Sequence, residues 1–473
     1  MKNIHQQLLN GVLVLVMLTV SVSVSAQTPF PASPQQKPVI LLGGTVHTAT
    51  GTVITNGAVA FDKGKLTYVG TAANAPADRS GWEVVNTTGK HIYPGFILPN
   101  SRIGLIEVEA IRATADADEQ GDYNPNVRSL VAYNTDSEHP ATYRFNGILL
   151  AEATPAGGVI SGTSSVMNLD GWNWEDAAHT RDVAIHLNWP GLQRPKFDFE
   201  TFTRTNEPNP DYSKTVGEIE NFFTEAGNYA KLASKEVNLK FDAMQGLFAG
   251  TQTLVIHCTA TREIIEAVKF AKGRNIARVA IAAGAEALPV ADLLKEHHIT
   301  VIVPSIHSLP VTDDEDIDLQ YSQAALLSRA GVKIAFSHTG SLGTGRNLPF
   351  FAGTSIAHGM DPEEAPQGLT KNPAHLLGIQ DRVGTLETGE DATLFVSAGD
   401  ALDFRTNKLS DAFIGGRRLV LPGKHEDLYN RAGKQLSHEC HFPPPGVFLF
   451  RLPAQECEDR YRTGGYECVV QVR

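Results

Sequence analysis

Strand-like and helix-like stretches alternate through the middle of this chain. Short apolar runs rich in β-branched residues are each followed by a longer stretch with apolar side chains at helical spacing. The predicted strands are residues 253–257, 277–283, 300–303 and 332–336, and the predicted helices are residues 262–274, 287–297 and 321–330. Strands that are apolar throughout are typical of a parallel sheet covered by helices on its faces. We therefore expect an α/β fold, with a (β/α)8 TIM barrel as its natural form.

A doubly wound open sheet would satisfy the same alternation. However, the sequence has no Gly-x-Gly-x-x-Gly turn after an early strand, and a dinucleotide-binding sheet of that kind needs this turn. The barrel is therefore the preferred interpretation, and we place it at residues 96–383.

Short β-type runs with turn residues between them mark both ends of the chain. The first set lies at residues 39–42, 57–61 and 65–69, and the second at residues 384–396 and 412–421. Runs of this length, separated by Gly, Asn and Asp-Lys-Gly turns, are typical of antiparallel sheet. We expect residues 38–95 and 384–430 to combine into one composite β-sandwich.

The first residues have the pattern of a cleaved secretory signal. Lys2 precedes an apolar stretch at residues 11–24, and small residues follow at Val24-Ser25-Ala26. A membrane anchor is the alternative, but this stretch is shorter than the ~20 residues that a bilayer span needs. Gln27 stands where a lipoprotein would have cysteine. We expect a signal peptide at residues 1–26, a leader at residues 27–37 and an exported protein, periplasmic or secreted, with no membrane span in the mature chain.

Charge and cysteine content indicate which partners and which stabilising bonds to expect. The 473 residues carry 52 acidic and 40 basic side chains, a net charge of -12, without a basic cluster that could follow a phosphate backbone. We therefore expect no nucleic acid partner. Four cysteines are few for an exported protein of this size, so disulfides are not expected to hold the fold together. Cys258 stands alone, whereas Cys440, Cys457 and Cys468 lie in an atypical tail at residues 431–473, where two of them could form a bridge.

One segment carries a family signature. It reads Gly89-Lys90-His91-Ile92-Tyr93-Pro94-Gly95-Phe96-Ile97-Leu98-Pro99-Asn100-Ser101-Arg102. This run resembles the G-K-x-hydrophobic-x-P-G-F-I-D-x-H-x-H segment of the amidohydrolase superfamily. Residues 153–162, 326–335, 369–378 and 382–392 resemble further family segments in the same order. The resemblance extends from about Val39 to about Tyr429 and is greatest to the imidazolonepropionase-like branch, in which a β-sandwich and a TIM barrel occur together.

The resemblance implies metal-dependent hydrolysis of carbon–nitrogen bonds other than ordinary peptide bonds, with zinc as the first choice of metal. Zinc with three protein ligands and an open position lowers the pKa of its bound water to about 7 and polarises the scissile carbonyl. In the family, two histidines come from the first barrel strand and others from the fifth and sixth, and an aspartate after the eighth strand takes the proton of the water. The corresponding residues here are Asn100 and Arg102, His257, Ala283, and His338.

Most of these residues cannot do what the family requires. A guanidinium has no free lone pair, so Arg102 cannot bind zinc and would repel a divalent ion. Asn100, Arg102 and Ala283 are therefore lost ligand positions, and no lysine that could bridge two metals occurs in residues 165–170. We expect a weakly catalytic or non-catalytic protein, a pseudoenzyme that acts as a binding or partner subunit. Its expected partners are a small-molecule or peptide-like ligand and either an active amidohydrolase paralogue or a second copy of the chain.

The alternative is an active metal-dependent amidohydrolase or dipeptidase-like hydrolase with a remodelled site. Three imidazoles can bind a single divalent metal, and His257, His307 and His338 are the candidate ligands at one face of the predicted barrel. His338 replaces the family's aspartate and is the candidate catalytic base. Arg346, in the loop after the predicted eighth strand, is a further candidate pocket residue that could hold an anion.

Overall fold

The computed structural model describes residues 31–198, 202–310, 315–421 and 428–433. The described residues up to 421 belong to one compact unit, and the described residues 428–433, which are helical, belong to a second. The predicted signal peptide, the first residues of the predicted leader and the three cysteines of the tail lie outside the described residues. None of the described helices is both long enough and apolar enough to cross a membrane.

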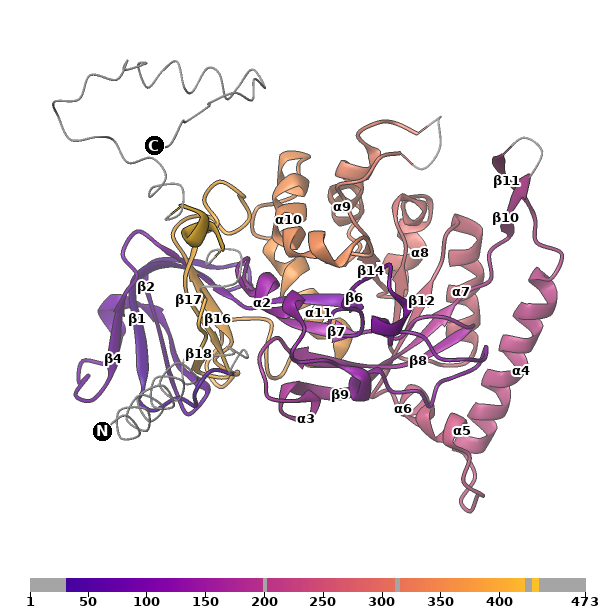
Figure 1. Ribbon diagram of the computed structural model, residues 1–473, viewed down its shortest axis with the longest axis horizontal. Coiled ribbons are helices and arrows are strands. Elements are labelled where there is room, and N and C mark those ends of the chain that lie inside the picture. The colour runs from indigo at the N-terminus through magenta and orange to yellow at the C-terminus, as the bar shows by residue number, and fades with distance from the viewer. Residues whose placement is uncertain (1–30, 199–201, 311–314, 422–427, 434–473) are drawn as a thin grey trace, which may run out of the picture. The chain divides into compact units, whose positions relative to one another are not determined.

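An eight-stranded sheet forms the centre of the first unit (Figure 1). The sheet is nearly closed, because Ser337 after the last strand donates a hydrogen bond from Oγ to the carbonyl of Pro99 in the first strand, at 2.8 Å. The expected mixed α/β fold with a barrel sheet is confirmed. In spatial order the strands are β15 (Ile334–Phe336), β14 (Thr300–Val303), β13 (Val279–Ala282), β12 (Thr253–His257), β9 (Ala178–Asn188), β8 (Ile160–Asn168), β7 (Ile148–Ala153) and β6 (Phe96–Ser101).

The strand β8 runs antiparallel to both of its neighbours, β7 and β9. The other neighbouring pairs of this sheet are parallel. A parallel crossover needs roughly a dozen residues or more. Residues 154–159 and 169–177, which connect β7 to β8 and β8 to β9, are too few for one. The parallel strand-and-helix alternation of a (β/α)8 barrel is therefore interrupted at β8, and it is regular from β12 onward.

Helices follow most of the barrel strands. The predicted helix at residues 262–274 is α7, which begins where the carboxylate of Glu263 accepts hydrogen bonds from the N–H groups of Thr259 and Ala260. The predicted helix at residues 287–297 is divided into a 3-10 segment and α8, because Pro289 has no N–H to donate. The α-helices are α2 (Glu138–Arg144), α3 (Trp174–Ala177), α4 (Tyr212–Ala230), α5 (Leu239–Ala243), α6 (Gln245–Ala249), α7 (Thr261–Gly273), α8 (Ala291–Glu296), α9 (Leu319–Arg329), α10 (Leu348–Ala357) and α11 (Lys371–Leu377).

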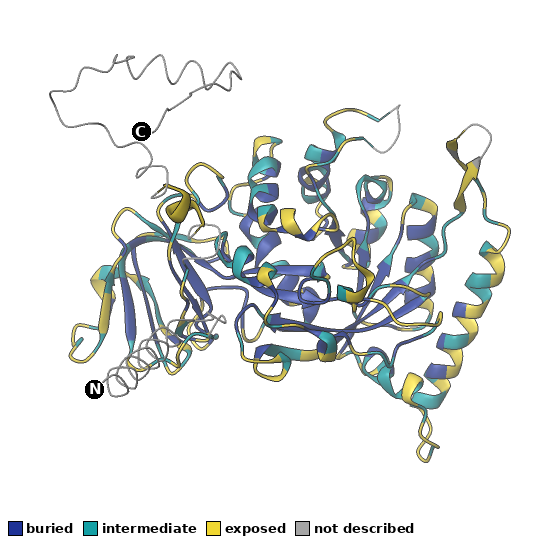
Figure 2. Ribbon diagram, in the orientation of Figure 1, coloured by how far each residue is buried: buried dark blue, intermediate teal, exposed yellow. Residues whose placement is uncertain are grey.

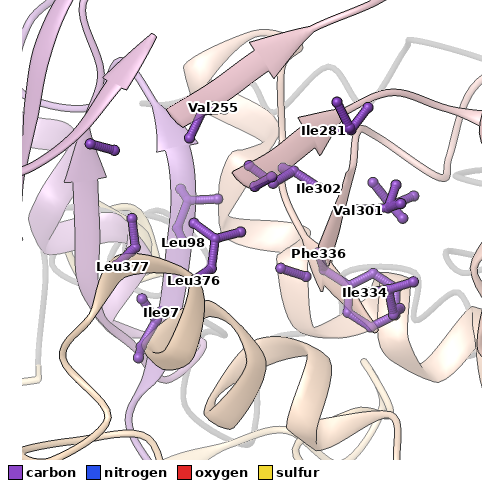
Figure 3. Close-up of a cluster of buried hydrophobic side chains, with 14 of the residues drawn as sticks. Ile97, Leu98, Val255, Ile281, Val301, Ile302, Ile334, Phe336, Leu376 and Leu377 are labelled. Atoms are coloured by element: carbon purple, nitrogen blue, oxygen red, sulfur yellow. The ribbon is translucent and has the colours of Figure 1, made fainter. Parts of the chain in front are cut away.

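The largest apolar core joins the barrel strands to these helices. The strands are buried along most of their length, whereas the helices keep exposed residues on the sides that face away from the sheet (Figure 2). Leu376 and Leu377 of α11 lie beside Ile97 and Leu98 of β6 (Figure 3). Full burial of a side chain of this size contributes about 1.5–3 kcal/mol relative to exposure.

Both ends of the first unit contribute strands to a second eight-stranded sheet. The strand β5 pairs antiparallel with β16, with Tyr93 opposite Phe395, so residues three hundred positions apart become neighbours. Apolar clusters pack on two sides of β1, one with Val39 and Leu41 and the other with Ile40. The strands are β1 (Val39–His47), β2 (Val53–Asp62), β3 (Lys65–Thr71), β4 (Glu83–Asn86), β5 (His91–Pro94), β16 (Leu394–Ser397), β17 (Leu409–Ile414) and β18 (Arg417–Arg418), and β10 (Gln193–Asp198) and β11 (Thr203–Pro208) form a separate hairpin.

Candidate functional site

A pocket of about 400 Å³ lies at the end of the barrel where the parallel strands have their carboxyl ends. The side chains that matter most for its chemistry are Asn100, Arg102, Glu109, Thr154, His257 and His338. Barrels place their ligand sites at this end, because the loops that follow the strands can vary without disturbing the core. A pocket of this volume suits a small molecule.

Asn100 lies near the end of β6 with an unusual backbone conformation. Its φ is +53°, in the left-handed region that asparagine tolerates better than most residues, and the pairing of β6 with β7 is irregular between Leu98 and Ser101. This conformation directs the N–H of Asn100 to Oε2 of Glu152, at 2.7 Å. Glu152 belongs to β7 and is fully buried.

Glu152 is the centre of a buried hydrogen-bond network. Its Oε1 accepts hydrogen bonds from Oγ of Ser164 on β8 at 2.6 Å and from Nε2 of His186 on β9 at 3.0 Å. Burial by itself raises the pKa of the Glu152 carboxyl. The charge of His186 and the hydrogen bonds from His186, Ser164 and the Asn100 N–H outweigh burial and hold that pKa below its usual range. Glu152 is therefore an ionised carboxylate, and both of its oxygens accept hydrogen bonds from other residues of the barrel.

The network reaches the pocket through two imidazoles. Nδ1 of His186 lies 3.1 Å from Nε2 of His257, at the end of β12, so one proton is shared between the two rings. Burial and, to a smaller extent, the charges of His186 and Arg102 lower the pKa of His257 to about 3, against the opposing effect of Glu152. His257 is therefore neutral near pH 7, and one of its two ring nitrogens is already engaged.

Arg102 follows β6 directly and is exposed at the pocket. Within the described part of the chain, its guanidinium forms neither a hydrogen bond nor an ion pair. A cation with five donors and no carboxylate partner is suited to bind an anionic group.

His338 and Glu109 are fixed by one loop. Nε2 of His338 donates to the carbonyl of Ser341 at 2.9 Å, and Oε1 of Glu109 accepts from the N–H of Leu342 at 2.7 Å. Burial lowers the pKa of His338, although the hydrogen bond to Ser341 and the charge of Glu109 oppose the shift. Because Nε2 carries the proton, Nδ1 of the neutral ring is a hydrogen-bond acceptor, and it has no partner among the described residues.

Part of the barrel sequence is similar to a known family. Residues 243–419 match the amidohydrolase family. This amidohydrolase-family segment extends from the helices before β12 to the second sheet and includes β12, β13, β14 and β15. No curated protein matches the chain at a significant level.

Solved structures with the same fold include an amidohydrolase from Thermotoga maritima MSB8. It has a TM-score of 0.70 and 23% sequence identity, over 81% of this chain and 99% of that chain. Another amidohydrolase has a TM-score of 0.50 and 15% identity, over 81% of this chain and 99% of that chain. A Xaa-Pro dipeptidase with bound methionine has a TM-score of 0.47 and 12% identity, with the same coverage. At these identities the likeness to the two amidohydrolases concerns the fold.

The structure places the three candidate histidine ligands in different surroundings. His257 and His338 line the pocket, whereas His307 does not. Nε2 of His307 instead forms a hydrogen bond with Oγ1 of Thr354 at 2.7 Å, and its ring packs against Phe351. Among the described residues, no group of three or more histidine, cysteine, aspartate or glutamate side chains is arranged to hold a metal ion. The predicted set of His257, His307 and His338 is thus not brought together.

The donor set of the pocket also does not fit the metal that the amidohydrolase family uses. Asn100 presents its backbone N–H to Glu152, Arg102 contributes a positive charge, and Ala283, which follows β13, has no donor atom. Glu152, the carboxylate nearest to His257 in the network, has its oxygens occupied by three hydrogen bonds. The described pocket residues therefore do not form a ligand set for a divalent metal.

Arg346 lies outside the pocket. It belongs to the 3-10 segment Leu342–Asn347, where its carbonyl accepts a hydrogen bond from Nδ2 of Asn146 at 2.6 Å. The pocket's cation is Arg102.

Sequence reasoning missed Glu152, His186 and Glu109. Glu152 and His186 each stand in an otherwise apolar strand, as in Leu149-Leu150-Ala151-Glu152-Ala153 and Val183-Ala184-Ile185-His186-Leu187. A titratable side chain in such a run is costly unless it is paired inside the protein. That signal was present in the sequence, but it does not identify the partner.

Proposed function

We propose that this protein is exported and that its barrel pocket binds a small molecule without metal-dependent hydrolysis. The observation that carries the proposal is the position of Arg102. Its guanidinium has no hydrogen bond or ion pair with the described residues, and it lines the pocket together with the neutral His257. A divalent cation placed beside these two residues would meet a fixed positive charge and only one free ring nitrogen of His257. Export is supported by the sequence pattern of residues 1–26.

Neither His257 nor the neighbouring Cys258 is activated to attack a carbonyl in the absence of metal. A general base works best when its pKa lies near the working pH, and the pKa of His257 is held far below that value. The neighbouring Cys258 is buried, and burial raises the pKa of its thiol above the ordinary value. Binding is the chemistry that the remaining groups support.

Metal content and chelator sensitivity test this proposal. Residues 27–473 are purified, dialysed and analysed for zinc, iron and manganese by plasma mass spectrometry, and thermal unfolding is measured with and without EDTA. We expect no stoichiometric metal and the same melting temperature in both conditions. His257→Ala should leave the response to chelator unchanged.

The matched control is the double variant Asn100→His with Arg102→His, which restores two imidazoles beside His257. We expect this variant to retain zinc and to lose melting temperature in EDTA, which shows that the assay detects a metal site in this fold. One metal per chain in the parent protein, together with release of product from a panel of small amides, would overturn the proposal in favour of a remodelled hydrolase.

A further inference from the structure

The pocket carries one group of each charge, and the two groups do not neutralise each other. Arg102 and Glu109 both line it, yet no ion pair joins them in the described structure. Opposite charges within hydrogen-bond reach in a pocket normally pair directly. Their separation leaves a cationic position and an anionic position available to one ligand.

The anionic position is built from two side chains. Glu109 binds the N–H of Leu342, and His338 donates to the carbonyl of the preceding residue, Ser341, so both side chains are tied to adjacent residues of one loop. Glu109 retains its second carboxylate oxygen, and His338 retains Nδ1 as an acceptor. Two acceptors tied to one loop are suited to an ammonium group, which is a donor only.

Two buried atoms of the pocket residues have no partner within the described structure. They are Oγ1 of Thr154 and Nδ1 of His338, and these residues are only 4% and 9% exposed. A buried polar atom without a hydrogen bond destabilises the protein. Both residues line the pocket, so a bound ligand that reaches these atoms would remove that cost.

We infer that the pocket binds a small zwitterion of the amino-acid or short-peptide class, with the carboxylate of the ligand on Arg102 and its ammonium group on Glu109 and His338. A guanidinium offers paired N–H groups in the geometry of a carboxylate, and an ammonium group offers three donors. The inference rests on the proposed function, because a pocket that does not hydrolyse its ligand keeps both ends of it intact.

Calorimetric titration of the purified protein with three forms of one dipeptide tests the ligand class. The probes are glycyl-L-glutamine, its N-acetyl derivative and its carboxyl-terminal amide. We expect the unmodified dipeptide to bind, and each blocked form to bind at least about tenfold more weakly, which corresponds to ~1.4 kcal/mol. Equal binding of all three forms, or no binding of the unmodified form by folded protein at millimolar concentration, would refute the inference.

Variants of the pocket assign each end of the ligand. Arg102→Gln should weaken the binding of the unmodified dipeptide about tenfold. It should leave the affinity of the amide unchanged, because the amide has no carboxylate that could bind Arg102. Glu109→Gln should also weaken the binding of the unmodified dipeptide about tenfold, and it should leave the affinity of the N-acetyl form unchanged. Arg112→Gln and Glu119→Gln, which alter the same charges on the same segment outside the pocket, are the controls and should bind like the parent.

The fate of the dipeptide separates this inference from the proposed function. Mass spectrometry of the titrated sample shows whether the Gly–Gln bond survives. Cleavage with preserved discrimination among the three probes would overturn the non-hydrolytic function and leave the ligand class standing. An intact dipeptide that does not bind would overturn the ligand class alone.

Discussion

The backbone N–H of Asn100, a residue of positive φ near the end of β6, donates a 2.7 Å hydrogen bond to Oε2 of Glu152. This contact links the backbone of the first barrel strand to a buried carboxylate of the second. The same carboxylate accepts from His186, which in turn meets His257 at the pocket. The strand positions where the family resemblance places metal ligands are therefore connected here by hydrogen bonds within the protein.

Glu152→Gln should destabilise the protein by about 3 kcal/mol. The substitution removes the charge that balances His186 and places an amide where three donors converge, and breaking a buried pair from one side has a cost of this size. Urea unfolding followed by circular dichroism measures the change. Glu225→Gln, at an exposed position of α4, is the matched control and should change the free energy of unfolding little.

The same variant should change how stability depends on pH. The folded-state pKa of Glu152 lies below its unfolded value, so its contribution is present above the unfolded pKa of about 4.3 and is lost as the pH falls through the folded pKa. The parent should lose stability on acidification below that range more steeply than Glu152→Gln. Parallel slopes for the two proteins would show that Glu152 is not ionised in the native state.

Asn100→Val should cost about 1–2 kcal/mol, whereas Asn100→Gly should be nearly neutral. The reason is the backbone, because a φ of +53° is accessible to glycine and strained for a β-branched residue. Thermal unfolding of the two variants beside the parent measures the difference. A similar loss in both would place the contribution in the asparagine amide instead of the backbone.

Glu390 should make the protein less stable as the pH rises from about 4.3 toward 7. This carboxyl is mostly buried, and burial raises its pKa to about 7 despite hydrogen bonds from the side chain and N–H of Thr385. A raised folded pKa gives stability that is complete below the unfolded pKa and is lost as the pH passes through the folded pKa. Melting temperatures between pH 4 and pH 8 should fall by a few degrees in the parent and by less in Glu390→Gln. The prediction fails if the two curves have the same slope.

Cys258 should react with thiol reagents only after the protein unfolds. It is 5% exposed, and burial raises the pKa of its thiol, so the reactive thiolate is scarce in the native state. Peptide mapping after a timed pulse of iodoacetamide follows this cysteine separately from those of the tail. Rapid labelling in native buffer would mean that the segment after β12 opens without global unfolding.

The sequence by itself determined the local elements of the barrel from β12 to β15. Apolar runs such as residues 253–257 and 300–303 agree with β12 and β14 in both bounds, because a strand buried on both faces needs apolar side chains at every position. It also indicated that the two ends of the first unit share one sheet, which the pairing of β5 with β16 confirms. Local periodicity is enough for such features.

Only the tertiary structure decided which polar side chains meet. Glu152 and His186 are 34 positions apart, His186 and His257 are 71 apart, and nothing local in the sequence couples them. The antiparallel course of β8 was equally hidden, because a short connection fixes strand direction while leaving the apolar pattern unchanged. The sequence alone showed that Asn100 and Arg102 stand at the positions of the family's two histidines. That Asn100 turns its N–H toward Glu152, and that Arg102 lines a pocket without a partner in the described structure, depends on contacts between strands that the sequence does not encode locally.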